Sequence, residues 1–177
     1  MRQVRVALHS ARQWRSEALL YTEPDKQSFF ANHLLDVVRQ VQQTSTGRGV
    51  TVVARSPAAF ATFPKTQQFT ENVVNQLCGD VAGVQADFSY GPFVLEPSLV
   101  DQLDTVPDGI GWGWRPFTFV VTARLGLPVT SVVGDFLCAE GDRQETPADR
   151  TYRMRQLAEN VRGFVCGTEW TLVNGVI

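Results

Sequence analysis

"LLYTEPDKQSFF", Leu19–Phe30, decides how the rest of the chain is interpreted. Its apolar start predicts a short buried strand over residues 18–22, and two carboxylates flanking a proline follow at once. A strand that is apolar on both faces lies centrally in a mostly parallel sheet. In such sheets ligands bind beyond the carboxyl ends of the strands. Glu23 and Asp25 are therefore predicted to lie at a ligand-binding edge.

Strands and helices alternate on both sides of this stretch, which predicts an α/β sandwich in one domain over residues 1–177. Further strands are predicted over 50–55, 93–95 and 127–136. Helices are predicted over 2–13, 27–43 and 66–78, from Pro97, over 117–125, and from a cap at Asp149 to about Phe164.

The composition excludes several classes of protein. A net charge of −2, with both signs mixed along the chain, gives no electrostatic footprint for nucleic acid. No apolar run is long enough to span a bilayer. The cysteines are odd in number and far apart, which favours a reducing cytoplasm over a disulfide framework. Neither C-x-x-C nor H-E-x-x-H occurs, so a structural zinc site is not expected.

The acidic turn supports two interpretations. The residue before a proline is held extended, and residues two apart on an extended segment project to the same side. Glu23 and Asp25 would then converge on a hard cation such as Mg²⁺ or Mn²⁺, with phosphate oxygens completing its shell. Alternatively, the two carboxylates cap the helix that begins near Gln27.

"GIGWGWRPF", Gly109–Phe117, is the second candidate constellation. Glycines let backbone approach a ligand closely, indoles stack on sugar rings, and an arginine can hold phosphate or carboxylate in a fork. If the loop is extended, Trp112 and Trp114 line one wall beside Arg115. The alternative is that both tryptophans pack in the core and Arg115 caps a helix.

Two further positions are less specific. Tyr90 either lines an acceptor pocket or packs before a turn, and packing is favoured. Arg55, at the end of the predicted strand 50–55, is interpreted as part of a solvated charged face rather than as a phosphate contact.

Residues 2–26, "RQVRVALHSARQWRSEALLYTEPDK", resemble the central stretch of a GT-A glycosyltransferase of the family 2 type. In that family a helix precedes a buried strand that ends in a D-x-D-like motif, and here Glu23 and Asp25 take its acidic positions, with Glu in place of the first Asp. Three later stretches look like the following elements: "SYGPFVLEPSLVDQL" (89–103), "DGIGWGWRPFTFVVTARLGLPVTSVVGDF" (108–136) and "DRTYRMRQLAENVRGFV" (149–165).

The resemblance implies a transferase that moves a sugar from a nucleotide-sugar donor to an acceptor, with Mg²⁺ or Mn²⁺ bound by Glu23 and Asp25. It also implies that Asp108, in preference to Asp104, removes the acceptor's proton. The implied acceptor wall consists of Tyr90, Gly91, Trp112, Trp114 and Arg115.

A complete member of that family begins with a further β-α-β segment that grips the nucleoside base. This chain resembles only the part that follows, so the expectation is the C-terminal part of a GT-A fold. An exposed sheet edge would then favour self-association into a homo-oligomer. Two other functions stay open: a truncated, inactive remnant or binding module, and a metal-dependent nucleotidyltransferase.

Overall fold

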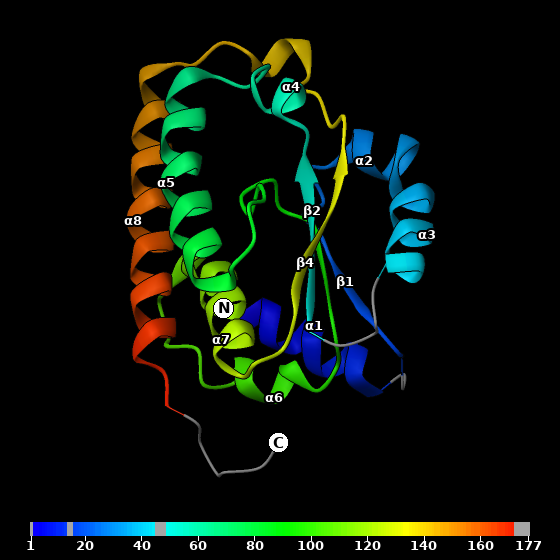
Figure 1. Ribbon diagram of the computed structural model, residues 1–177. Coiled ribbons are helices and arrows are strands. Elements are labelled where there is room, and N and C mark those ends of the chain that lie inside the picture. The colour runs from blue at the N-terminus through cyan, green and yellow to red at the C-terminus, as the bar shows by residue number, and fades with distance from the viewer. Residues whose placement is uncertain (1, 14–15, 45–48, 172–177) are drawn as a thin grey trace.

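The computed structural model describes residues 2–13, 16–44 and 49–171 (Figure 1). The strands are β1 (Leu19–Tyr21), β2 (Val50–Arg55), β3 (Phe93–Leu95) and β4 (Val129–Gly134). The α-helices are α1 (Arg2–Gln13), α2 (Gln27–Asn32), α3 (Leu34–Thr44), α4 (Pro57–Phe60), α5 (Lys65–Ala82), α6 (Leu99–Leu103), α7 (Trp114–Arg124) and α8 (Pro147–Glu169). Two 3₁₀ turns, η1 (Gly111–Gly113) and η2 (Glu140–Asp142), complete the elements.

The four strands form one sheet in the order β1-β3-β2-β4. The chain is therefore α/β as predicted, but the expectation of a mostly parallel sheet is wrong. β3 runs antiparallel to both β1 and β2, and only β2 and β4 pair in parallel. The expectation that the strand before Glu23 lies centrally and is buried on both faces is also wrong, because β1 is an edge strand in which only Leu19 is buried. Both errors have one physical reason: a short apolar run does not determine which strands it pairs with or in which direction.

Strand direction nevertheless places the candidate site. Tyr21 and Val52 both pair with Phe93, and β2 and β4 run in register from Val50 to Arg55. The carboxyl ends of β1, β2 and β4 therefore share one edge of the sheet. The residues that follow these three strands meet there.

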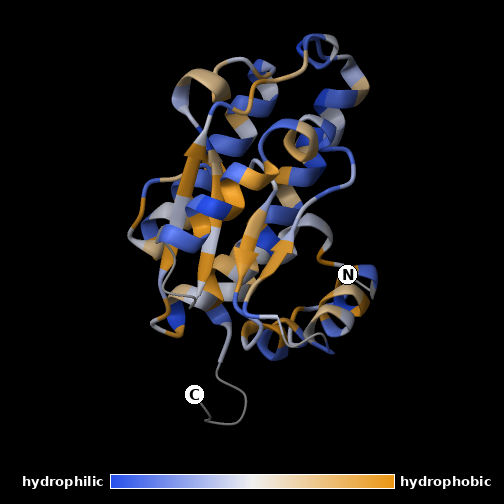
Figure 2. Cartoon of the chain, turned by 90° about the vertical axis from the view of Figure 1, so that its right-hand side faces the viewer, coloured by the Kyte–Doolittle hydropathy of each residue, from blue (hydrophilic) through white to orange (hydrophobic). Residues whose placement is uncertain are grey.

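Helices cover both faces of the sheet. α2 and α3 lie on one side, while α5, α7 and α8 lie on the other, with α1 and α6 below (Figure 1). Alternate residues of β2 supply the two cores: Val50 and Val52 join the larger cluster, and Val53 joins the smaller one with Phe29 and Val37. Figure 2 shows the apolar colouring concentrated along the strands between these layers. The fully buried β2 confirms the prediction of a buried strand over residues 50–55.

Several helix boundaries differ from the predicted ones. α5 and α8 extend to Ala82 and Glu169, beyond the predicted ends at residue 78 and at about Phe164. The predicted helix over 27–43 is divided at His33 into α2 and α3. α7 begins at Trp114, inside the predicted glycine-rich loop. Thr146, not Asp149, is the N-cap of α8, and the side chain of Asp149 completes a capping box with it.

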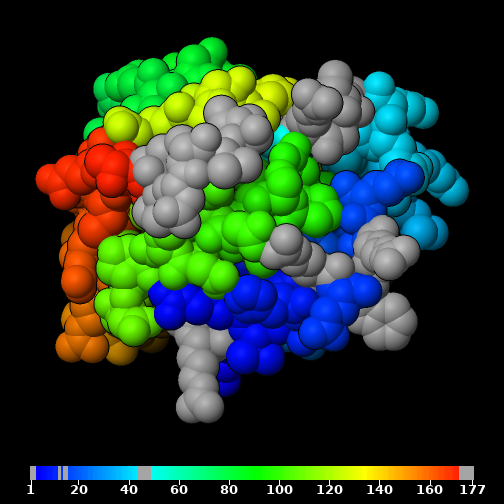
Figure 3. Space-filling view, turned by 90° about the horizontal axis from the view of Figure 1, so that it is seen from below, coloured from blue at the N-terminus to red at the C-terminus, as the bar shows by residue number. Residues whose placement is uncertain are grey.

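Seen from below, α1 lies against the segment that contains α6 (Figure 3). The three cysteines are free, and burial raises the pKa of the Cys78 thiol to about 12, so that it behaves as a small apolar group. In the part of the chain that the structure describes, no helix has the length and apolar character needed to cross a membrane.

Candidate functional site

A cleft of about 840 Å³ lies at the sheet edge where β1, β2 and β4 end. Its walls come from the turn after β1, from α5, from the segment before β3, from the start of α7, from the 137–146 loop and from α8. Sheets of this class bind their ligands at the carboxyl ends of strands, and pockets of this size hold small molecules.

A buried ion pair between Glu23 and Arg115 forms part of the cleft wall. Arg115 Nη1 donates to Glu23 Oε1 over 2.9 Å, and the two residues are 5 % and 8 % exposed. Glu23 Oε2 and Arg115 Nε are buried and have no hydrogen-bond partner within the described ranges. Both atoms are almost inaccessible to solvent. Burial, the charge of Glu23 and a side-chain hydrogen bond to Glu23 raise the pKa of Tyr21, so the Tyr21 hydroxyl lies beside this carboxylate.

Gly91 explains how the Glu23 carboxylate fits in this position. Its φ is 130°, a backbone conformation that favours glycine. A Cβ on residue 91 would lie 2.3 Å from Glu23 Oε2. That Gly91 contacts the acceptor substrate stays a prediction. Its close contact with the Glu23 side chain is direct.

A second buried ionic cluster centres on Arg55, so its interpretation as a solvated charge is wrong. Arg55 Nε donates to Asp87 Oδ2 over 2.5 Å, and Nη2 donates to Glu71 Oε2 over 2.5 Å. Gln67 Nε2 donates to the other Glu71 oxygen over 2.8 Å. The guanidinium is also stacked against aromatic rings, at 4.2 Å from the ring centroid of Phe63. A sequence has no local signal for this cluster, because its members are far apart along the chain.

The carboxyl group of Glu71 titrates abnormally. Burial raises its pKa above the ordinary 4.5, the charge of Asp87 raises it further, and Arg55 offsets part of this shift. The folded protein therefore holds a proton on Glu71 at pH values where the unfolded chain has released it.

We expect this shift to make stability depend on pH. As pH rises above about 4.5, the unfolded state loses the Glu71 proton first, so this group's contribution favours unfolding until its folded-state pKa is passed. Glu71→Gln removes the titration, so the free energy of unfolding of wild type should fall relative to that of the variant as pH rises. Urea unfolding at intervals from pH 4 to pH 8 measures this, with the exposed Glu140→Gln as control. Parallel curves for wild type and Glu71→Gln would contradict the prediction.

The two tryptophans of the glycine-rich segment lie in different environments. Trp112 is half-buried and lines the cleft, with the Arg115 guanidinium 5.1 Å from its ring centroid. Trp114 is a core residue that packs edge-on against Tyr21 at 4.7 Å between centroids. The prediction of a shared wall is wrong for Trp114, because residues 111–113 form a 3₁₀ turn that leads into α7, and residues two apart in a helical backbone do not project to the same side. Glu159 fixes the turn by accepting the Trp112 backbone N–H at 2.8 Å.

Tyr90 both packs and lines the cleft. Its ring stacks nearly parallel on Phe136 at 4.8 Å, and Lys26 Nζ lies 5.3 Å from its centroid. Burial raises the pKa of Tyr90 to about 12, so the phenol is neutral at physiological pH. The preference for packing is consistent with this position, and the ring is still part of the cleft wall.

The predicted base, Asp108, does not lie with the predicted metal ligands. Asp108 is absent from the cleft lining: its side chain is 90 % exposed, and it accepts from Arg5 Nη1 on α1 at 2.8 Å. Asp25 is exposed and lies on the cleft wall near Glu23. Among the residues that the structure describes, no three His, Cys, Asp or Glu side chains gather in a way that could hold a metal ion.

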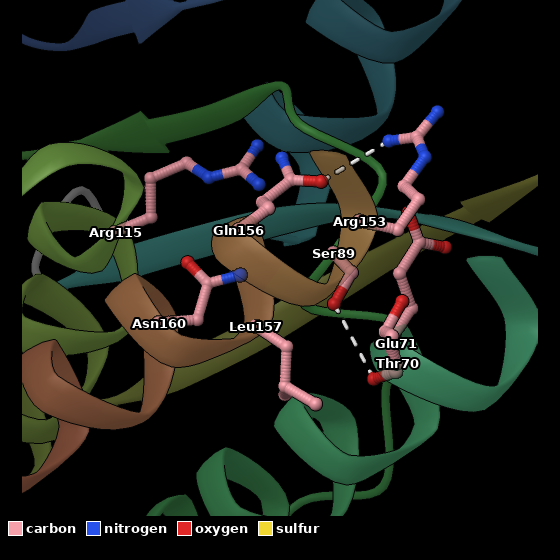
Figure 4. A pocket seen from close by; sticks show the side chains of 8 residues that line it. All are labelled: Thr70, Glu71, Ser89, Arg115, Arg153, Gln156, Leu157 and Asn160. Carbon is pink, nitrogen blue, oxygen red and sulfur yellow. Dashed lines mark hydrogen bonds between the residues drawn. The ribbon is translucent and has the colours of Figure 1, made fainter. Parts of the chain in front are cut away.

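A small cavity of about 10 Å³ is lined by residues of α5, α7 and α8 and shares several of its lining residues with the cleft (Figure 4). Arg115 from α7 and Gln156 and Asn160 from α8 converge on it, and Arg153 donates to Gln156 Oε1 over 3.1 Å. The spacing of Arg153, Gln156 and Asn160 at three and four residues places them on one face of a helix, a signal that the sequence carries.

Comparison with protein-family models, with curated proteins and with solved structures found no match to this chain.

Proposed function

We propose that the cleft binds a carbohydrate and that the chain is a glycosyltransferase-type domain, which transfers a sugar from a nucleotide-sugar donor to an acceptor held in this cleft. The observation that carries the proposal is the half-buried Trp112 ring on the wall of the cleft, beside the buried Glu23–Arg115 pair. An indole offers an apolar face to the C–H surface of a sugar, and a paired carboxylate and guanidinium offer an acceptor and a donor to its hydroxyls.

The position of the cleft supports the same proposal. It lies where three strands of one direction end, the general location of ligand sites in α/β sheets. Glu23 follows β1 as the acidic motif follows its strand in the family that the sequence resembles.

The residues present do not fit the expected Mg²⁺ or Mn²⁺ ion well. Glu23 already balances its charge with Arg115, so a divalent ion on the same carboxylate would lie next to a guanidinium. Asp25 would be the only other carboxylate of the motif, and the described part of the chain gathers no larger donor set. We therefore assign no step to a metal, and metal dependence is one arm of the experiment.

A binding module without transferase activity is the second candidate. It is favoured by the position of Asp108, because a base that is bonded to Arg5 outside the cleft does not reach a hydroxyl held against Trp112. Release of nucleoside diphosphate separates the two candidates, since only a transferase produces it.

Calorimetric titration with UDP-, GDP- and ADP-sugars and with the free sugars, each with and without Mn²⁺, tests the proposal. Trp112→Ala should weaken sugar binding roughly tenfold, because it removes the stacking surface. The matched control is Phe69→Ala, which removes an exposed aromatic ring of α5 that does not line the cleft. The proposal fails if no sugar or nucleotide-sugar binds, or if Trp112→Ala binds as tightly as wild type.

A further inference from the structure

β4 forms one edge of the sheet, and in the described part of the chain its outer side pairs with no strand. The Ser56 N–H donates to the Gly134 carbonyl, which fixes the side of β4 that faces β2. In this parallel register the even-numbered residues of β4 turn their backbone groups toward β2. The N–H and C=O groups of Ser131 and Val133 therefore point out of the sheet, where Figure 1 shows no helix across β4.

This edge lacks the features that usually keep sheet edges apart. Natural edge strands are protected by lysine, by proline, by a bulge or by being very short. Residues 125–134 include no charged side chain, β4 itself has no proline, and Val133 is 54 % exposed. Asp135, the first charged residue after β4, accepts from the Ser56 hydroxyl, so its carboxylate is turned toward the β2 side. The edge is therefore open to pairing with another strand.

A second copy of β4 fits this edge better than the other edge strand of the chain does. β1, at the opposite edge of the sheet, has three residues, whereas β4 has six. Pairing of β4 with β1 of another copy would leave part of β4 unpaired and would build an open-ended assembly. Two β4 strands related by a two-fold axis pair along their length and close the assembly, and neither brings a charged side chain against the other.

We infer that β4 is a homodimer interface, in which the β4 strands of two copies pair antiparallel and join the two sheets into one. With Val132 on the two-fold axis, Ser131 of each copy lies opposite Val133 of the other. Both residues have outward backbone groups, so each opposed pair exchanges both N–H···O bonds. The exposed Val133 side chain then packs against the neighbouring strand.

This interface is separate from the proposed function. Val133 does not line the cleft, which lies beyond the carboxyl end of β4. Antiparallel strands point in opposite directions, so the clefts of the two copies lie at opposite ends of the interface. Failure of the dimer would therefore leave the sugar-binding proposal unaffected, and the reverse also holds.

Sedimentation equilibrium from about 1 µM to about 500 µM measures the oligomeric state, and wild type should be a dimer at the upper end of this range. Val133→Lys should raise the dissociation constant of the dimer at least about tenfold, because a lysine on an edge strand opposes pairing. Val6→Lys, the same substitution at a 60 % exposed position of α1, is the matched control and should dimerise as wild type does. Three results would each overturn the inference: a monomer throughout, assemblies that grow beyond a dimer, or a Val133→Lys dimer as tight as that of wild type.

Amide hydrogen exchange locates the interface without relying on a variant. The Val132 N–H faces β2, so it should exchange slowly in both monomer and dimer. The N–H groups of Ser131 and Val133 should exchange at least about tenfold more slowly in the dimer than in the dilute monomer. Equally fast exchange in a dimer would place the interface elsewhere, and equally slow exchange in the monomer would mean that the chain itself covers the edge. Either result would overturn the inference.

Discussion

Gly163→Ala is expected to lower the free energy of unfolding by about 3 kcal/mol or more. α8 crosses the start of α7 where Gly163 faces Gly113, and a Cβ on residue 163 would lie 1.9 Å from the Gly113 carbonyl oxygen. Both partners at this contact are backbone, so no side chain can rotate away, and the helices must separate. Because Trp112 immediately precedes Gly113 and Arg115 follows it by two residues, the displacement should also weaken ligand binding in the cleft.

Urea unfolding followed by circular dichroism measures the loss. Gly141→Ala is the matched control, since a Cβ there meets nothing within 4 Å and the position is exposed. We expect the control to stay within about 0.5 kcal/mol of wild type. A Gly163→Ala protein as stable as the control would show that the two helices do not need this close contact.

The positions of most elements could be predicted from the sequence, because local apolar patterns report burial. β2 and α1 lie where their residues predicted them, and the strand before Glu23 exists. The direction of β3 could not be predicted, because pairing with Tyr21 and Val52 is a tertiary property. The same holds for the break at His33, since Phe29 packs against Tyr90 and Phe136, which are remote in sequence.

Some residues of the candidate site could be predicted from the sequence, but the contacts between them could not. Glu23, Tyr90, Trp112 and Arg115 were selected from local motifs, and all four line the cleft. Which partner balances Glu23 was not predictable, because Arg115 is 92 residues away along the chain. The acidic motif predicted to bind a metal ion is paired through Glu23 with Arg115 of α7, and only folding creates this contact.

Arg55→Met should be among the most destabilising single changes in this chain. Arg55 is 4 % exposed and is shared by Glu71 and Asp87, so its removal leaves two buried carboxylates facing each other without a cation. Breaking a buried ion pair by deleting one partner costs about 3–5 kcal/mol, a large part of the stability of a small domain. Urea unfolding and the recovery of soluble protein both report this loss.

An exposed arginine provides the control. Arg39 on α3 pairs with Asp36 on the surface, where both side chains are more than half exposed, and Arg39→Met should change the free energy of unfolding by less than about 1 kcal/mol. A similar change in the free energy of unfolding at both positions would show that the buried ion pairs of Arg55 stabilise the fold no more than a surface ion pair does.

The decisive variant removes the unpaired charges together. In Arg55→Met combined with Glu71→Gln and Asp87→Asn, the cluster holds no ionisable group, so the electrostatic penalty of the single variant disappears while the change in shape remains. We therefore expect the triple variant to be more stable than Arg55→Met alone, and its stability to vary less with pH, because Glu71 no longer titrates. If the triple variant is no more stable than the single one, Arg55 stabilises the fold through its stacking on Phe60, Phe63 and Tyr90 and not through its charge.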